Sequence, residues 1–443
     1  MRKLFILLIY LIVNIISFSQ SPPDSKPNIL TKPTRIDSIV IKGNEATKDF
    51  IILRELTFQT RDVVDSTLLH FNRERVFSLA LFNRVELSVL KISDKNVLVI
   101  EVEESWYLYP IPYWYTKNNS IETLTYGIYF LRRNFRGRNE TLKANIAFGY
   151  DKYFSIQYDN PALFYDNEIG FSALASYYNY TNVNETAKKL NEGDFIYKLI
   201  RVSVGFWKRI NQFYLVGSKT AFDYWEINTK PKGALTASGT KVDHLPSLSI
   251  YQFYDTRDLK LFSQDGIYTF FSFTHKGFGV DGISYNTFEM DLRGYQTIAG
   301  ELSSKLRLFH RRSFGKQVPY YDYSFLGFSE KIRGHNNIFF DAHNSILTSL
   351  ELSYPLLNEW NFSIKLPLIP KNLTSARVGI HLNVFADAGT VFNNGEPLIL
   401  QKFHSGYGAG ITLLLLPYNA FRFEYAINER GKGEIVFAAG FSF

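Results

Sequence analysis

The chain has 443 residues, and its aromatic content of 16%, with 39 Phe and 29 Tyr, is high for a soluble protein. After the N-terminal region no segment has the roughly 18 consecutive apolar residues of a transmembrane helix, so a membrane span would have to consist of strands. The 49 basic and 42 acidic residues give a net charge of +7 without a dense basic block, and no nucleic-acid partner is expected. The absence of cysteine excludes disulfides and thiolate metal sites.

Residues 1–19 have the pattern of a signal peptide. Arg2 and Lys3 precede an apolar stretch over residues 4–16, and the small residue Ser19 suits the last position before cleavage. The polar, proline-rich segment 20–34 is expected to be a linker. Export predicts that the protein reaches the periplasm or the outer membrane.

Residues 35–105 are expected to form a small α+β domain with the order strand, two helices, two strands. Residues 36–42 are rich in β-branched side chains, and Thr47 is positioned to cap the first helix. Val64 and Leu68 begin a helical spacing for the second helix, and the pattern then changes to alternation in the last two strands. On pattern alone, any small α+β domain remains an alternative.

In residues 106–443 the helical spacing gives way to alternation of apolar with mostly polar or small side chains. Phe421, Phe423 and Tyr425, for example, alternate with Arg422 and Glu424. Because successive side chains of a strand point to opposite faces, each such strand has one apolar and one polar face. The pattern predicts a mainly β fold, in which an antiparallel transmembrane β-barrel of about sixteen strands follows the small domain. The polar stretches 185–194 and 228–243 are expected to be surface loops.

The two ends of this region predict a weak seam in the barrel. The segment 106–115 contains Pro110 and Pro112, which cannot donate hydrogen bonds to a neighbouring strand. Pairing between this strand and the C-terminal strand is therefore expected to be incomplete. The residues assigned to the seam are Pro110, Pro112, Tyr113, Phe441 and Phe443. Alternatively, segment 106–115 is a linker in the interfacial aromatic belt, and the first strand begins near Thr123.

Arg333 is the most informative single residue, because two later strand-like segments each carry one isolated carboxylate, Glu351 and Asp387. A lone acid between apolar neighbours places a charge on one face of a strand, so that face must be polar. Two carboxylates on neighbouring strands can pair with a guanidinium inside a polar lumen. We therefore predict that the loop around Arg333 folds into the barrel. The alternative is an ordinary exposed turn at Arg333-Gly334.

These features together resemble the outer-membrane assembly and surface-antigen superfamily, whose members include BamA and TamA. The resemblance covers about residues 35–443, and residues 35–105 look like one POTRA domain. The tetrapeptide Ile332-Arg333-Gly334-His335 is similar to the signature loop motif of the family, with His335 in place of the usual aromatic residue. The other matching segments are 39–44, 54–56, 81–85, 134–138, 159–161 and 255–258 with Gly266.

The resemblance implies a sixteen-stranded barrel with an imperfectly closed seam, a lumen loop paired with Glu351 and Asp387, and a periplasmic domain that handles client chains. The implied function is insertion of β-barrel proteins into the outer membrane, or translocation of polypeptides across it, without nucleotide hydrolysis. The expected partners are unfolded outer-membrane or secreted polypeptides, outer-membrane lipid and accessory periplasmic subunits. The alternative is a passive porin or a structural surface protein.

No catalytic constellation is apparent in the sequence. The eight histidines are scattered, and neither a zinc-protease spacing, a nucleophile elbow nor a phosphate-binding glycine loop is present. No enzyme activity, cofactor or metal site is therefore expected. A barrel lipase whose Ser and His converge from distant strands remains an alternative, for which lipid hydrolysis by the purified protein is the test.

Overall fold

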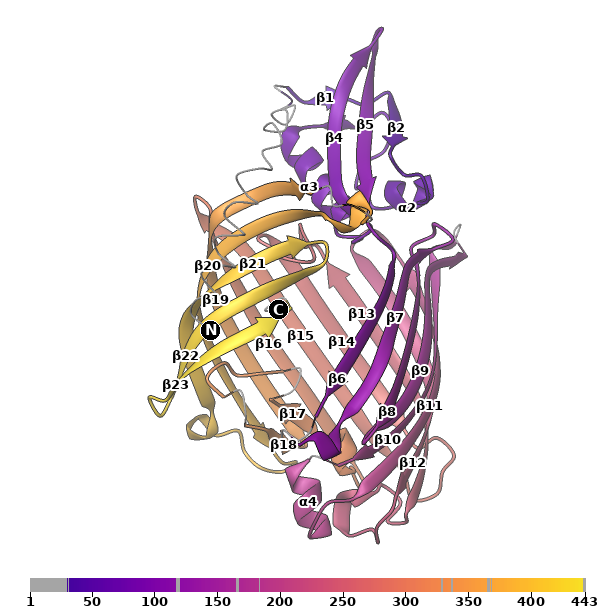
Figure 1. The fold of residues 1–443 in the computed structure, drawn as a ribbon, viewed down its shortest axis with the longest axis vertical. Helices are drawn as coiled ribbons and strands as arrows, with labels where there is room; N and C mark the ends of the chain where they lie inside the picture. Colours follow the sequence, from indigo (N-terminus) through magenta and orange to yellow (C-terminus); the bar gives the residue numbers. More distant parts are fainter. Residues whose placement is uncertain are drawn as a thin grey trace.

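The computed structural model describes residue 30 and residues 32–440, except 117–119, 165–166, 183, 328–329, 336–337, 365–366 and 368. The expected signal peptide and most of the expected linker lie outside the described residues. So do Phe441 and Phe443 of the expected seam. A small α+β domain lies at one end of a large barrel (Figure 1).

The small domain has the predicted order of strand, two helices and two strands. Its sheet has three strands in the order β2-β5-β4, and β2 is parallel to β5 while β4 is antiparallel to it. The strands are β2 (Ser38–Lys42), β4 (Phe82–Ile92) and β5 (Lys95–Glu104), and the helices are α2 (Asp49–Leu53) and α3 (Ser66–Phe77). A two-stranded ladder of β1 (Thr34–Arg35) and β3 (Val63–Val64) is an addition that the sequence did not predict.

Two local predictions in this domain are wrong. The helix α2 begins after Lys48, which supplies no side-chain cap. Thr47 instead donates its hydroxyl to Glu104 at 2.5 Å, because the end of β5 lies beside it. Val64 pairs in β3 and does not belong to the second helix. That helix begins after Asp65, whose carboxylate accepts a hydrogen bond from the Leu68 amide at 2.7 Å.

The barrel is a 16-stranded sheet in which strands adjacent in the chain pair antiparallel, so the prediction of sixteen strands is confirmed. Two short strands in the loop after β16, β17 and β18, are not part of this sheet and pair with each other. The strands are β6 (Leu108–Tyr115), β7 (Thr125–Phe135), β8 (Glu140–Gly149), β9 (Lys152–Phe164), β10 (Ile169–Thr181), β11 (Ile196–Arg209), β12 (Tyr214–Ile227), β13 (Val242–Asp255), β14 (Gly266–Lys276), β15 (Tyr285–Ala299), β16 (Leu302–Gly315), β19 (Asn344–Ser363), β20 (Ser375–Phe392), β21 (His404–Leu416), β22 (Asn419–Asn428) and β23 (Gly433–Ala439).

The two expected polar loops lie at the end of the barrel away from the small domain, and each contains a short helix. These are α4 (Glu185–Asn191) and the 3-10 helix η3 (Gly233–Leu235). Among the residues that the structure describes, no helix has the length and apolar character needed to cross a bilayer.

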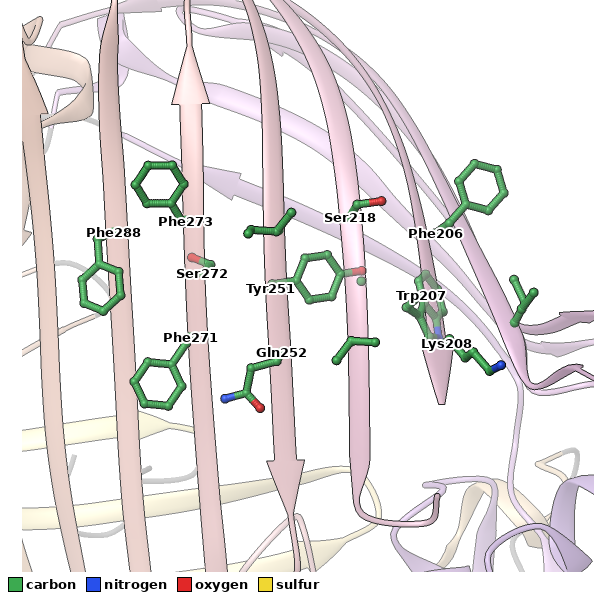
Figure 2. Close-up of a pocket in the computed structure, with 14 residues that line it drawn as sticks. Phe206, Trp207, Lys208, Ser218, Tyr251, Gln252, Phe271, Ser272, Phe273 and Phe288 are labelled. Atoms are coloured by element: carbon green, nitrogen blue, oxygen red, sulfur yellow. The ribbon is translucent and has the colours of Figure 1, made fainter. Parts of the chain in front are cut away.

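The outer wall of the barrel carries rows of exposed apolar side chains. Ile250 is 58% exposed, and its cross-strand partners are Ser218 on β12 and Phe273 on β14. A shallow hollow of about 640 Å³ is lined by Val216, Gly217 and Ser218 of β12 and by larger aromatic side chains of neighbouring strands, such as Phe206 and Phe273. Figure 2 shows these aromatic side chains on either side of Ser218. The opposite face carries charged pairs such as Arg201 with Asp223. An apolar outer face and a charged inner face are what a barrel needs when lipid surrounds it and its lumen is polar.

The first and last strands of the barrel occupy the two ends of the sheet. Within the described residues, β6 pairs only with β7, and β23 pairs only with β22. The pairing of β6 is continuous from Leu108 opposite Arg132 to Tyr115 opposite Thr125. Segment 106–115 therefore contains a strand, and the alternative of a simple linker is wrong.

The small domain is docked on the mouth of the barrel. Its buried core, which includes Val76 and Phe77, is continuous with barrel residues at that mouth: Leu259, Phe262, Leu414, Leu416 and Ala420. The turn 134–138 also contacts the domain directly, because the Lys48 amide donates to the Gly137 carbonyl at 2.8 Å. A Cβ at Gly137 would lie 2.0 Å from the Ala46 carbonyl oxygen, so this approach requires glycine.

Buried ion pairs reinforce this docking. Glu74 on α3 is 3% exposed and accepts hydrogen bonds from Arg377 of β20 and from Arg73, each at 2.6 Å. Glu55 likewise bridges Arg75 of the domain, at 3.0 Å, and Arg209 of β11, at 2.7 Å. Because a buried charge that loses its partner is costly, these pairs favour the docked arrangement over a separated one.

We expect acidification to weaken the docking through Glu74. Burial alone would raise the pKa of this carboxyl, but Arg377 and Arg73 outweigh burial and lower the pKa from 4.5 to about 2. The contribution of Glu74 is thus complete above pH 4.5 and is lost as the pH falls from 4.5 towards 2. Energy transfer between dyes on cysteines introduced at Asp94 and Glu301 should decrease over this range.

Glu74→Gln should reproduce the acid-induced separation at pH 7, because within the described part of the chain it leaves Arg377 and Arg73 with the half-buried Glu359 as their one acidic partner. Loss of a buried pair costs about 3 to 5 kcal/mol. The control is Glu86→Gln, which removes an exposed pair with Arg84 worth about 0 to 1 kcal/mol. Equal energy transfer in the two variants and the parent protein would contradict the proposed role of Glu74.

Candidate functional site

The loop between β16 and β19 carries the motif 332–335 and folds against the inner wall of the barrel. It contains β17 (Ser324–Leu326) and β18 (Phe340–Ala342), which pair with each other and contact β19 and β20. Figure 1 shows these strands near the end of the barrel that is opposite the small domain. The motif thus lies in the lumen, towards the outer end.

Arg333 is 7% exposed and is held by carboxylates from three strands. It forms three hydrogen bonds with Asp387 on β20, from Nε at 2.7 Å, from Nη2 at 2.8 Å and from the backbone amide at 3.1 Å. Its Nη1 donates to Glu351 on β19 at 2.9 Å and to Glu424 on β22 at 3.2 Å. Its guanidinium carbon also lies 3.6 Å from the centre of the Phe385 ring. The exposed-turn alternative is therefore wrong.

The charges around Arg333 balance within the lumen. Lys305 on β16 donates to Glu351 at 3.2 Å, and Arg422 donates to Glu424 at 3.4 Å. Together with Asp387 they form a compensated cluster of three cations and three carboxylates. Lys305 is 1% exposed, and its Nζ lies 3.6 Å from the centre of the Phe262 ring. Each of these buried charges therefore has at least one partner of opposite sign.

The other motif residues fix the position of the loop backbone. Ile332 is buried in an apolar cluster with Phe309, Leu326 and Leu347. Gly334 has a φ of +93°, a conformation that favours glycine. The backbone also comes very close to β21, because a Cβ at Gly406 would lie 1.8 Å from the Arg333 carbonyl oxygen. The loop therefore fits against the wall because Gly406 leaves room for the Arg333 carbonyl and Gly334 permits the positive φ of the loop.

His335, the residue that departs from the family pattern, is 5% exposed and faces β21 and β22. Its Nε2 lies 2.7 Å from the Glu429 carboxylate and 3.2 Å from the Ser405 carbonyl oxygen. The Glu429 carboxylate is also 3.3 Å from Nδ1 of His404. Histidine at this position therefore makes polar contacts that an aromatic hydrocarbon ring cannot make.

The expected seam residues on β6 lie along one open edge of the sheet. Pro110 and Pro112 are exposed, whereas Tyr113 faces the lumen, where its hydroxyl lies 2.9 Å from Oδ1 of Asn145 and 2.6 Å from the Tyr153 hydroxyl. The structure thus brings together Arg333, Glu351 and Asp387, and it places the seam residues of β6 apart from them.

Several residues of the site were missed at the level of sequence. Glu424 has the same signal as Glu351, an acid between apolar neighbours, and this signal could have identified it. Lys305 and Gly406 had no distinguishing signal, because their roles depend on which strands and loops lie beside them. The contacts of His335 with His404 and Glu429 were not predicted for the same reason.

We expect Arg333→Ala to destabilise the folded barrel by about 3 to 5 kcal/mol, because it leaves Asp387 and Glu351 buried without their main partner. Arg333→Lys should have an intermediate effect, since an ammonium group cannot make the two-pronged contact with Asp387. The measurement is the temperature at which the compact, heat-modifiable band disappears on a cold gel.

The exposed residue Arg430 gives a matched control, since its side chain is 77% exposed. Arg430→Ala should melt like the parent protein. An unchanged melting temperature in Arg333→Ala, with ready labelling from outside the cell of a cysteine placed at position 333, would contradict the buried pairing.

Comparisons with known proteins agree with this architecture. The Omp85 superfamily domain matches residues 134–443, and the POTRA family, described as a surface antigen variable number repeat, matches residues 34–105. Outer membrane protein assembly factor BamA of Neorickettsia risticii (strain Illinois) is 35% identical over 74 residues, which is 17% of this chain and 10% of that protein. The matched stretch therefore represents a small part of that relative.

Two solved structures have a similar fold. BamA from Haemophilus ducreyi lacking POTRA domains 1-3 aligns with a TM-score of 0.54 at 16% identity, covering 92% of this chain and 84% of that one. CdiB from Escherichia coli aligns with a TM-score of 0.54 at 11% identity, covering 91% and 75%. The family match over most of the barrel confirms the resemblance seen in the sequence. The chain belongs to the Omp85 superfamily, as an outer-membrane β-barrel with an N-terminal periplasmic POTRA domain.

Proposed function

We propose that this protein inserts β-barrel proteins into the outer membrane or passes polypeptides across it, without nucleotide hydrolysis. The observation that carries the proposal is the pair of strand edges at β6 and β23, which have no partner strand among the described residues. An unpaired strand edge presents backbone donors and acceptors that can template another strand. Family membership and the assembly-factor name of the BamA relative support the same role.

The prolines of β6 favour a weak seam at this edge. Alternate residues of an antiparallel strand direct their backbone groups to the same side, and Pro110 and Pro112 are two positions apart. Because the pairing of β6 with β7 is unbroken, we infer that both proline nitrogens face the open edge. Each missing hydrogen bond removes about 0.5 to 1.5 kcal/mol, so the edges can separate while the remaining ladders stay intact.

The clients in this proposal are unfolded outer-membrane or secreted polypeptides that arrive from the periplasm. The POTRA sheet offers two edge strands, β2 and β4, and each carries exposed apolar side chains, such as Val40 and Leu90. An extended client segment can add to such an edge. Outer-membrane lipid surrounds the barrel, and accessory periplasmic subunits are further partners in the proposal. A passive pore needs neither the docked domain nor the compensated loop in its lumen.

Locking the seam should abolish activity. Cysteines at Tyr113 or Tyr115, each combined with one in segment 436–442, can be joined by oxidation or by a short bifunctional crosslinker, and the chain has no native thiol. The measurement is client assembly or secretion in cells before and after reduction. The matched control joins Ser203 to Ala221, which are direct partners in β11 and β12. Full activity in every locked variant would rule out opening at the seam.

Removal of residues 35–104 should abolish client handling and leave a folded barrel. Loss of the domain takes away the strand edges of β2 and β4, while every ladder of the 16-stranded sheet is retained. Heat modifiability of the truncated protein checks the barrel, and client levels in the outer membrane or medium check the function. Unaffected assembly and secretion with a folded, truncated barrel would show that the domain has no such role.

A further inference from the structure

Three metal-ligating side chains meet at the outer end of the barrel, next to the arginine cluster but not part of it. They are His335 of the loop motif, His404 at the start of β21 and Glu429 directly after β22. Their ligand atoms all lie within 4.8 Å of one another. His335 is 5% exposed, so it is almost completely buried, and its Nε2 points towards the carboxylate.

We propose that His335, His404 and Glu429 form a binding site for a divalent transition-metal ion of the zinc class. Two imidazoles and one carboxylate are a ligand set that Zn²⁺ uses in proteins, with a fourth position left for water. Zinc in tetrahedral geometry holds its ligand atoms about 3.4 Å apart, given metal–ligand distances of about 2.0 to 2.2 Å. In the present structure Nε2 of His335 lies 2.7 Å from Oε2 of Glu429, and Nδ1 of His404 lies 3.3 Å from Oε1 of the same carboxylate. The ligand atoms are thus already within 4.8 Å of one another, and side-chain adjustments of about 1 Å would bring them to the tetrahedral spacing.

The residues around the three ligands leave one side of the site open to solvent. The side chains of His404 and Glu429 are each 28% exposed, so an ion and a water ligand have access from solvent. The His404 ring is held in place by Phe340, whose ring stacks on it with centroids 4.1 Å apart. Ser405 also donates its amide to Glu429 at 3.1 Å, which orients the carboxylate. A bound ion would replace the direct contacts between the carboxylate and the two imidazoles.

The position of the ligands gives the ion a structural consequence. His335 belongs to the lumen loop, whereas His404 begins β21 and Glu429 directly follows the neighbouring strand β22. Coordination would fasten the loop motif to β21 and β22, one strand away from the open edge of β23. The three residues are far apart in the sequence, which explains why no metal spacing was visible there.

Calorimetry and spectroscopy on the folded, full-length protein in detergent test this site. After dialysis against a chelator, the protein is titrated with Zn²⁺, and separately with Co²⁺ to record the visible absorption of a tetrahedral ion. We expect saturable binding of one ion. Loss of a residue that merely orients a ligand lowers metal affinity by about 10- to 100-fold, so His404→Ala and Glu429→Gln should lower it by about 100-fold or more.

The matched control is His343→Ala, because His343 contacts Asn393 at the same end of the barrel and lies outside the cluster. It should bind as the parent protein does, and cold-gel mobility confirms that every variant is folded. Absence of saturable binding by the folded parent protein would show that the cluster is only hydrogen-bonded. Unchanged binding in both His404→Ala and Glu429→Gln would place the ion elsewhere and overturn the proposal.

Discussion

Charge compensation inside the barrel is the constraint on which the rest of the structure depends. A guanidinium that is almost fully buried is stable only when carboxylates replace its water, and Arg333 has three of them. Those carboxylates belong to β19, β20 and β22, so the loop can occupy only one position against the wall. The same requirement explains why acids interrupt otherwise apolar strands that face lipid on their other side.

The sequence predicted the features that depend on local pattern. Alternation with period two revealed the strands, and isolated acids revealed Glu351 and Asp387 as the carboxylates that meet Arg333 in the structure. Helix starts were less accurate, because a residue such as Thr47 fits a cap by type but is engaged by Glu104 from a distant strand. Such competition depends on the tertiary structure and leaves no trace in the neighbouring residues.

The parts of the site that were missed all depend on contacts between distant segments. Gly406 matters because the loop backbone crosses it, and a glycine within a strand gives no indication of what approaches it. Lys305 and Glu424 complete the charge balance, but their partners lie 46 and 91 residues away in the chain. The position of the POTRA domain on the mouth likewise rests on long-range pairs such as Glu74 with Arg377.

The packing of Phe262 connects the two ends of the lumen. This ring belongs to the core that the POTRA domain shares with the mouth, and its face lies against the ammonium of Lys305. Lys305 in turn holds Glu351, and Glu351 holds Arg333. A domain that leaves the mouth would uncover Phe262 and admit water to Lys305, which weakens every later contact in this series. Undocking of the POTRA domain at the mouth would thereby reach the lumen loop through a relay of alternating charges.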